Sequence, residues 1–261
     1  MIPLPSQPKI VEKKDNSAVF EIDGLWPGYG ATIGNSLRRV LLSSLRGSAI
    51  TQAKIKGAQH EFSTISGVLE DVVTILLNLK QLRFKLHGEE PQKVTLSVKG
   101  EKDVTGSDFD LPSQVELMNK DAKVATVTDK KTELEIEIMI ENGMGYEPVE
   151  SRKKGKLEIG TISLDAIFTP VRRVSYRVEN VRIGERTDFD RLVLELETDG
   201  SLTPEEALNQ ASEILVSHFA FIGGAFSSVS IKPEAKGKEE KTSVKKKGKN
   251  HEKAKKGKKT K

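Results

Sequence analysis

A strict alternation of apolar and polar residues between positions 133 and 140 is the feature that most constrains the fold of this chain. Every second position holds an aliphatic side chain: Leu134, Ile136, Ile138 and Ile140. Because successive side chains of a β-strand point to opposite faces of the sheet, the pattern predicts a strand with one buried and one solvated face. The same period recurs over 94–98 and 192–196, and shorter candidates lie at 19–22 and 171–183. Such half-buried strands are typical of antiparallel sheets.

Three segments instead show the spacing of three and four residues that one face of a helix requires. They are 32–45, 68–79 and 204–222. The third begins at Thr203-Pro204-Glu205-Glu206, where threonine can cap the helix, proline suits its first position and Glu206 can close a capping box. A few helices among antiparallel strands predict an α+β fold.

Length and composition limit the class of protein. A chain of 261 residues can form one sizeable folded unit with a subdomain. No run approaches the roughly 18 apolar residues that a membrane helix needs, and the first residues do not resemble a secretory signal, so we expect a soluble, cytoplasmic protein. The absence of cysteine excludes disulfides, cysteine-bound zinc and thiol catalysis.

The charge divides sharply along the sequence. From Lys232 onward the chain has 14 lysines, no arginine and four glutamates, a net charge of +10, whereas the preceding residues have 28 basic and 34 acidic side chains, a net charge of −6. Ordering 233–261 would bury too little apolar surface to offset the backbone entropy. We therefore expect this segment to be a disordered tail that either solubilises the protein or attracts phosphates without regard to sequence.

The sequence contains no convincing catalytic or metal-binding constellation. Gly28-Tyr29-Gly30 and Gly143-Met144-Gly145 lack the rest of a phosphate-loop motif, so we interpret them as turns. Asp108-Phe109-Asp110 and Asp188-Phe189-Asp190 could offer paired carboxylates to magnesium, but each lacks a third acid nearby and fits a solvated turn better. The histidines have no partner at metal-ligand spacing: His60, His87, His218 and His251. The chain is predicted to be a scaffold or binding module.

Several stretches carry a resemblance to a known family. Residues 28–51, GYGATIGNSLRRVLLSSLRGSAIT, closely resemble the first long helix of the alpha subunit of bacterial-type DNA-directed RNA polymerase. Other stretches follow in the order of that family: HEFSTISGVLEDVVTILLNLK from His60, GMGYEP from Gly143, DAIFTPVRRVSYRVENVR from Asp165 and ERTDFDRLVLELETDGSLTPEEAL from Glu185. Together they extend over about 10–231.

The resemblance implies two subdomains, because in this family the chain leaves one subdomain, builds a second and returns to the first. A discontinuous dimerisation subdomain would comprise 1–47 and 174–232, and an inserted, mainly β subdomain would comprise 48–173. A homodimer would cover the wide apolar stripes of the helices at 32–45 and 204–222. Its interface would contain Ile33, Leu37, Val40, Leu41, Leu208, Ala211, Leu215, Phe219 and Ile222.

The resemblance also implies that one copy of the dimer binds the beta subunit and the other binds beta-prime. The candidates for beta binding are Arg39, Leu42, Phe62, Gly67, Glu70, Thr74, Gly143, Gly145, Tyr146 and Pro148, and those for beta-prime binding are Lys80 and Arg186. The large subunits perform nucleotidyl transfer, so this subunit would be a non-catalytic part of the enzyme. We expect no cofactor in it, and we expect the magnesium and zinc of the complex in other subunits.

One departure from the family concerns DNA. Family members usually carry a small helical C-terminal domain that grips promoter DNA, and here the Lys-rich tail takes that place. Lysine without arginine or aromatic residues favours phosphate attraction over base reading. We therefore expect contact with DNA through the holoenzyme and at most weakly through the tail. The expected location is the nucleoid-associated cytoplasm, or the organellar stroma for a plastid-encoded chain.

A stand-alone nucleic-acid-binding or ribosome-associated protein that uses the basic tail is the alternative interpretation. It predicts that the isolated chain binds RNA or DNA and that the body is dispensable. The alpha-subunit interpretation predicts co-purification with very large polymerase subunits.

Overall fold

The structure is a computed structural model that describes residues 2–152 and 158–224. The chain divides into two compact units, Met1–Phe221 and Ile222–Lys261. The sheets and the two main hydrophobic cores belong to the first unit. The tail predicted at 233–261 lies outside the described residues.

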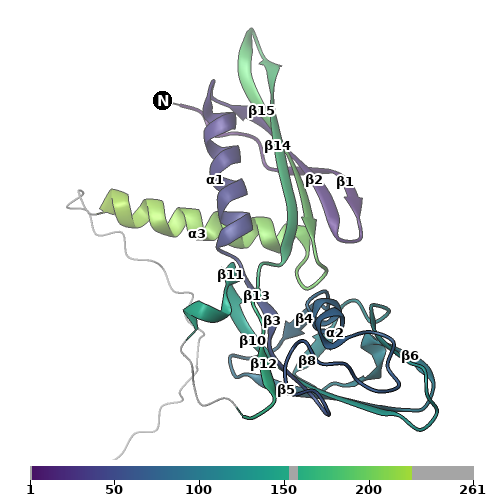
Figure 1. Cartoon of the computed structure of the whole chain (residues 1–261). Coiled ribbons are helices and arrows are strands. Elements are labelled where there is room, and N and C mark those ends of the chain that lie inside the picture. Colours follow the sequence, from purple (N-terminus) through teal and green to yellow (C-terminus); the bar gives the residue numbers. More distant parts are fainter. Residues whose placement is uncertain (1, 153–157, 225–261) are drawn as a thin grey trace, which may run out of the picture. The chain divides into compact units, whose positions relative to one another are not determined.

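The first sheet contains four antiparallel strands in the order β1, β2, β15, β14 (Figure 1). The bounds are Lys9–Lys14 for β1, Ser17–Leu25 for β2, Val171–Ile183 for β14 and Arg186–Thr198 for β15. Strands from distant parts of the sequence are neighbours, since Phe20 of β2 pairs with Leu194 of β15. Two helices, α1 (Tyr29–Ser43) and α3 (Pro204–Gly224), share a hydrophobic core with this sheet.

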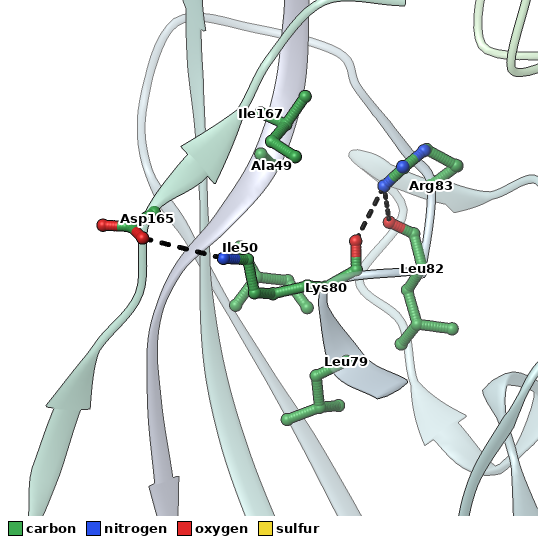
Figure 2. A pocket seen from close by; sticks show the side chains of 8 residues that line it. All are labelled: Ala49, Ile50, Leu79, Lys80, Leu82, Arg83, Asp165 and Ile167. Atoms are coloured by element: carbon green, nitrogen blue, oxygen red, sulfur yellow. Dashed lines mark hydrogen bonds and ion pairs between the residues drawn. The ribbon is translucent and has the colours of Figure 1, made fainter. Parts of the chain in front are cut away.

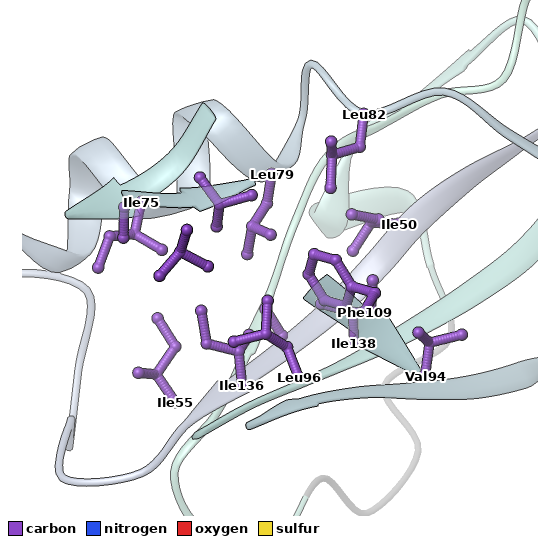
Figure 3. Packing of buried hydrophobic residues seen from close by; sticks show 14 of the residues in the cluster. Ile50, Ile55, Ile75, Leu79, Leu82, Val94, Leu96, Phe109, Ile136 and Ile138 are labelled. Carbon is purple, nitrogen blue, oxygen red and sulfur yellow. The ribbon is translucent and has the colours of Figure 1, made fainter. Parts of the chain in front are cut away.

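The second sheet is built from the middle of the sequence and follows the order β7, β5, β10, β3, β4, β8, with β12 paired to β3. The bounds are Arg46–Ile55 for β3, Phe84–Leu86 for β4, Gln92–Lys99 for β5, Phe109–Asp110 for β7, Val115–Leu117 for β8, Glu133–Met144 for β10 and Thr161–Ser163 for β12. Helix α2 (Val72–Leu79) covers its apolar face, and Figure 3 shows Ile75 and Leu79 directed toward the side chains of the strands.

Short elements complete this region. Two small two-stranded sheets pair β6 (Lys102–Thr105) with β9 (Lys123–Val127) and β11 (Tyr146–Glu147) with β13 (Ala166–Ile167). Two 3-10 helices span Gly106–Asp108 and Val149–Ser151.

The strands predicted from the period of two are confirmed. All four aliphatic residues of the alternation at 134–140 are buried in β10, and the glutamates between them lie on the other face, where Glu135 pairs with Lys56 and Glu137 pairs with Lys93. The runs at 94–98 and 192–196 lie in β5 and β15. The predicted α+β fold is also confirmed, whereas the subdomain boundaries at 47 and 174 stay a prediction.

The predicted helices are present with shifted ends. The third begins at Pro204 as expected, and its capping box forms: the Thr203 N–H donates to Glu206 Oε2 at 3.1 Å and the Glu206 N–H donates to Thr203 Oγ1 at 3.3 Å. The helix predicted at 68–79 begins only at Val72, because the Asp71 side chain caps it by accepting from the Thr74 N–H at 2.8 Å. Val68 instead forms a bridge to Val127.

The helix predicted at 32–45 begins earlier, at Tyr29, and its cap comes from a distant strand. Gly28, the residue before the helix, has φ 85° and no capping side chain of its own. The N–H groups of Gly28 and Gly30 donate to Asp190 Oδ2 of β15 at 2.9 and 3.0 Å. The interpretation of Asp190 as part of a solvated turn is therefore wrong: this residue is buried in a strand and caps α1.

The turn interpretation of the paired glycines holds for two of the four. Gly28 and Gly145 have positive φ, which glycine adopts without strain. Gly30 lies inside α1, where a Cβ would come within 2.7 Å of the Val178 side chain, and Gly143 lies in β10, where a Cβ would come within 2.5 Å of the Phe168 ring. These two glycines allow close packing.

Removing the cap of α1 should destabilise the protein. Asp190→Ala leaves two N–H groups at the start of the helix without their acceptor, so we expect the free energy of unfolding to fall by about 1 to 3 kcal/mol. Urea denaturation measures this loss. Asp188→Ala is the matched control, because Asp188 lies two residues away on the same strand and its side chain is exposed. Equal losses in the two variants would contradict the capping role.

Candidate subunit-binding surfaces

The nine residues predicted for the dimer interface differ in how deeply they are buried in their own chain. Four of them belong to the hydrophobic core under the first sheet: Leu37, Leu41, Leu208 and Ala211. Leu41 and Ala211 have 0% exposure and so offer no surface to a second copy. These four side chains pack on the sheet of their own chain, and their assignment to the interface stays a prediction. Ile33, Val40 and Leu215 are half-buried against the same core.

The C-terminal part of α3 leaves several large apolar side chains exposed. Phe219 is 63% exposed and Ile222 is 57% exposed. Val216 at 67% and Phe221 at 81%, which were not among the predicted interface residues, are exposed as well. Figure 1 shows this part of α3 extending past the strands that its first turns cover. We call Val216 and Phe219, which lie three residues apart on one face of the helix, the α3 patch. A concentration of large exposed apolar side chains on a few helical turns is typical of a protein interface.

A second surface joins the end of α1 to the loop at 143–148. Gly145 lies beside the last turn of α1, because a Cβ on it would be 3.3 Å from the Ser43 carbonyl oxygen. Its own carbonyl accepts from the Phe168 N–H at 2.8 Å. The structure therefore brings Arg39 and Leu42, both exposed on α1, near the loop that carries Tyr146 and Pro148. We call this the α1–loop surface.

Exposed side chains around Tyr146 extend the α1–loop surface. Met144 and Ile167 are exposed beside it, and neither was predicted, because each occupies an ordinary strand position in the sequence. Desolvation and the Asp165 carboxylate raise the pKa of Tyr146 above its ordinary value. The Val149 N–H, which donates to Asp165 at 3.0 Å, lowers the pKa of that carboxyl. Tyr146 is thus a phenol that stays protonated at neutral pH.

The other predicted beta-binding residues lie along α2 and the loop before it. Phe62 and Thr74 are exposed, and so are Leu69 and Leu77, which were not predicted. Gly67 has φ 77°, and a Cβ there would come within 2.1 Å of Thr132 Oγ1, so it shapes the loop. Three large apolar side chains, Phe62, Leu69 and Leu77, are thus exposed among the polar residues of this region.

Glu70, in the same loop, has its carboxylate engaged within the chain. It accepts from the Thr126 N–H at 2.6 Å and from Thr126 Oγ1 at 3.0 Å, and it pairs with Lys123 at 3.1 Å. Burial raises its pKa, but these donors outweigh burial and hold the pKa below its ordinary value. Glu70 is therefore placed to fix the loop to β9.

The two candidates for beta-prime binding occupy different surroundings. Lys80 lines a shallow pocket at the end of α2, where its Nζ lies 3.8 Å from Asp165 Oδ2 (Figure 2). Arg186 lies at the start of β15 and donates two hydrogen bonds to Asp188, at 3.0 and 2.6 Å. Its guanidinium also lies over the Trp26 ring, 4.7 Å from the centroid. Arg186 is thus held by a carboxylate and an aromatic face.

The described residues contain no group of three or more His, Cys, Asp and Glu side chains that could hold a metal ion. Within the same residues, no helix combines the length and apolar character that crossing a membrane requires.

Comparison with known proteins assigns the family. A family model described as the RNA polymerase Rpb3/RpoA insert domain matches residues 53–169. A DNA-directed RNA polymerase subunit alpha of Oceanobacillus iheyensis is 47% identical over 222 residues, covering 83% of this chain and 70% of the relative. The corresponding subunit of Roseiflexus castenholzii is 48% identical, covering 80% of this chain and 64% of the relative. That of Carboxydothermus hydrogenoformans is 47% identical, covering 81% of this chain and 68% of the relative.

The chain thus spans about two thirds of the length of these curated relatives. The resemblance found at 28–51 and in the later stretches is confirmed. The comparisons support an alpha subunit and do not support the alternative of a stand-alone nucleic-acid-binding or ribosome-associated protein. The chain belongs to the family of DNA-directed RNA polymerase alpha subunits.

Proposed function

We propose that this chain is a homodimeric scaffold on which the beta and beta-prime subunits of RNA polymerase assemble, and that it performs no nucleotidyl transfer itself. The observation that carries the proposal is the α3 patch, Val216 and Phe219. A second copy is the partner that we propose for it, since an isologous contact uses the same patch twice and closes on itself.

The α1–loop surface is the proposed contact with the beta subunit. It combines a guanidinium at Arg39, an apolar side chain at Leu42 and the phenol of Tyr146. Aromatic and arginine side chains are enriched where protein interfaces concentrate their binding energy. The surface on α2 and its preceding loop, with Phe62 and Thr74, is proposed as a second contact area. Lys80 and Arg186 are proposed for beta-prime.

Arg39→Ala should weaken capture of the beta subunit and leave the homodimer intact, because Arg39 is exposed on α1 and lies outside the α3 patch. We expect a loss of about 2 kcal/mol, the lower end for a charged contact that becomes buried at an interface. Pull-down of purified beta at several concentrations measures the affinity, and Arg38→Ala is the matched control from the next exposed position. Unchanged capture by Arg39→Ala would refute the assignment.

The tail supports a separate, weaker proposal about DNA, which rests on charge alone. A net charge of +10 on 232–261 should attract duplex DNA by releasing counterions, with a slope of log affinity against log salt of about −0.9 per phosphate neutralised. Deleting 233–261 should remove this affinity and spare dimerisation. A salt titration with promoter and random duplexes, on full-length and truncated chains, checks it. Promoter-selective binding that survives moderate salt would contradict it.

A further inference from the structure

Arg83 and Asp199 form an ion pair between segments that flank the two hydrophobic cores of the unit Met1–Phe221. Arg83 follows α2 and lies between Leu82 and Phe84, which belong to the core under the second sheet. Asp199 follows β15, whose Leu196 belongs to the core under the first sheet. Arg83 Nε lies 3.7 Å from Asp199 Oδ2, and the two side chains are only 22% and 8% exposed. Water therefore screens this pair less than the surface pairs of the chain.

The Arg83 end of the pair is held firmly. Its N–H donates to Asn119 Oδ1 at 2.8 Å. Its Nη1 donates to the carbonyl oxygens of Lys80 at 2.8 Å and Leu82 at 3.2 Å, as Figure 2 shows. The Lys80 carbonyl lies at the C-terminal end of α2, where a positive charge is favourable. The guanidinium is thereby fixed to α2.

The Asp199 end is held equally firmly. Its N–H donates to the Pro170 carbonyl at 2.9 Å. Its Oδ1 accepts from the N–H and the hydroxyl of Ser201 at 3.0 and 2.6 Å. The other oxygen, Oδ2, is the one that faces Arg83. Through its carboxylate and its backbone N–H, Asp199 thus joins the turn before α3 to the segment that returns from the second sheet.

The electrostatics explain why this contact should persist. Burial lowers the pKa of the Arg83 guanidinium, the Asp199 carboxylate opposes that effect, and Arg172 adds to it. An arginine nevertheless stays charged in proteins. Separating the two residues would leave a guanidinium in a poorly solvated place without its carboxylate.

We infer that the Arg83–Asp199 pair is a positioning device that fixes the two cores against each other. It adds to the pairing of Arg46 with Met144, which already places the end of α1 beside the loop at 143–148. The effect on partner binding rests on the proposed function. The effect on the orientation of the cores does not.

The orientation can be measured directly, because the chain has no cysteine of its own. Cysteines introduced at the exposed positions Glu12 of β1 and Ser97 of β5 would carry spin labels, one on each sheet. Mixing with excess unlabelled chain leaves one labelled copy per dimer. Pulsed electron resonance then gives the distribution of distances within one copy.

The variants are Arg83→Met, which removes the charge, Asp199→Asn, which keeps the size and an acceptor for Ser201, and the two combined. Lys93→Met is the control, because it breaks an exposed ion pair within the second sheet. We expect a wider distance distribution in both single variants, no further widening in the double variant, and the parent distribution in the control. The affinity of each single variant for purified beta should fall about tenfold, which is within the range of coupling energies between contacting residues.

A parent-like distance distribution in a folded Asp199→Asn chain would overturn the inference, and so would widening that is additive in the double variant. Thermal melts identify any variant that fails to fold. If Arg83→Met fails to fold, Asp199→Asn alone tests the inference. If the parent chain itself fails to capture beta, the proposed function is wrong, while the distance distributions still test the pair.

Discussion

Phe219→Glu is expected to convert the proposed homodimer into folded monomers. Burying a phenylalanine side chain is worth about 1.5 to 3 kcal/mol, and a symmetric interface buries it twice, so the expected loss of dimer stability is about 3 to 6 kcal/mol. The fold should survive, because the side chain is 63% exposed in its own chain. Sedimentation equilibrium gives the dimer dissociation constant, and circular dichroism reports the fold.

Gln210→Glu is the matched control for Phe219→Glu. It adds the same charge to an exposed position of α3, in the half of the helix that packs on its own sheet. The control should remain a dimer. Ala211→Glu should behave differently from both, since Ala211 is fully buried and a charge there should unfold the chain. A parent-like dissociation constant for Phe219→Glu would rule out the α3 patch as the dimer contact.

Gly47→Ala is expected to cause a severe loss of stability. A Cβ at this position would lie 1.9 Å from the Phe168 carbonyl oxygen, a backbone atom that cannot rotate away as a side chain could. Overpacking typically costs about 1 to 3 kcal/mol and occasionally more, and we expect at least the upper end of that range. Urea denaturation measures the change. Because Phe168 also donates to Gly145 at 2.8 Å, the α1–loop surface should be disturbed as well.

The control for Gly47→Ala is Gly224→Ala, which adds the same methyl group at a helical position with open space around it. Its effect should stay within about 1 kcal/mol, the difference in helix propensity between the two residues. Similar unfolding free energies for the two variants would show that the backbone near Phe168 adjusts without cost.

The sequence pattern predicted those features that depend on near neighbours. The alternation at 134–140 predicted a half-buried strand because the period of two is a local property of the backbone. Thr203 and Glu206 predicted the start of α3 because a capping box needs only four consecutive residues.

The features that the sequence did not predict depend on contacts between distant residues. The sequence around Asp190 indicated a turn. Only the pairing of β15 with β2 places its carboxylate at the start of α1. The apolar stripe of α3 shows the same limit, since Ala211 and Phe219 share a face in the sequence pattern. A stripe does not distinguish side chains that pack on the sheet of their own chain from side chains that stay exposed, and the structure separates these two groups by burial.

The position of Asp190 also constrains the order in which the protein can fold during synthesis. The N–H groups that it caps belong to Gly28 and Gly30, about 160 positions earlier in the chain. When α1 leaves the ribosome, neither its cap nor the strand β15 beside β2 has yet been made. The residues of the second sheet, from Arg46 to Ser163, are complete sooner. We therefore expect the middle of the chain to fold first. The first turn of α1 should become stable only after the C-terminal strands have been synthesised.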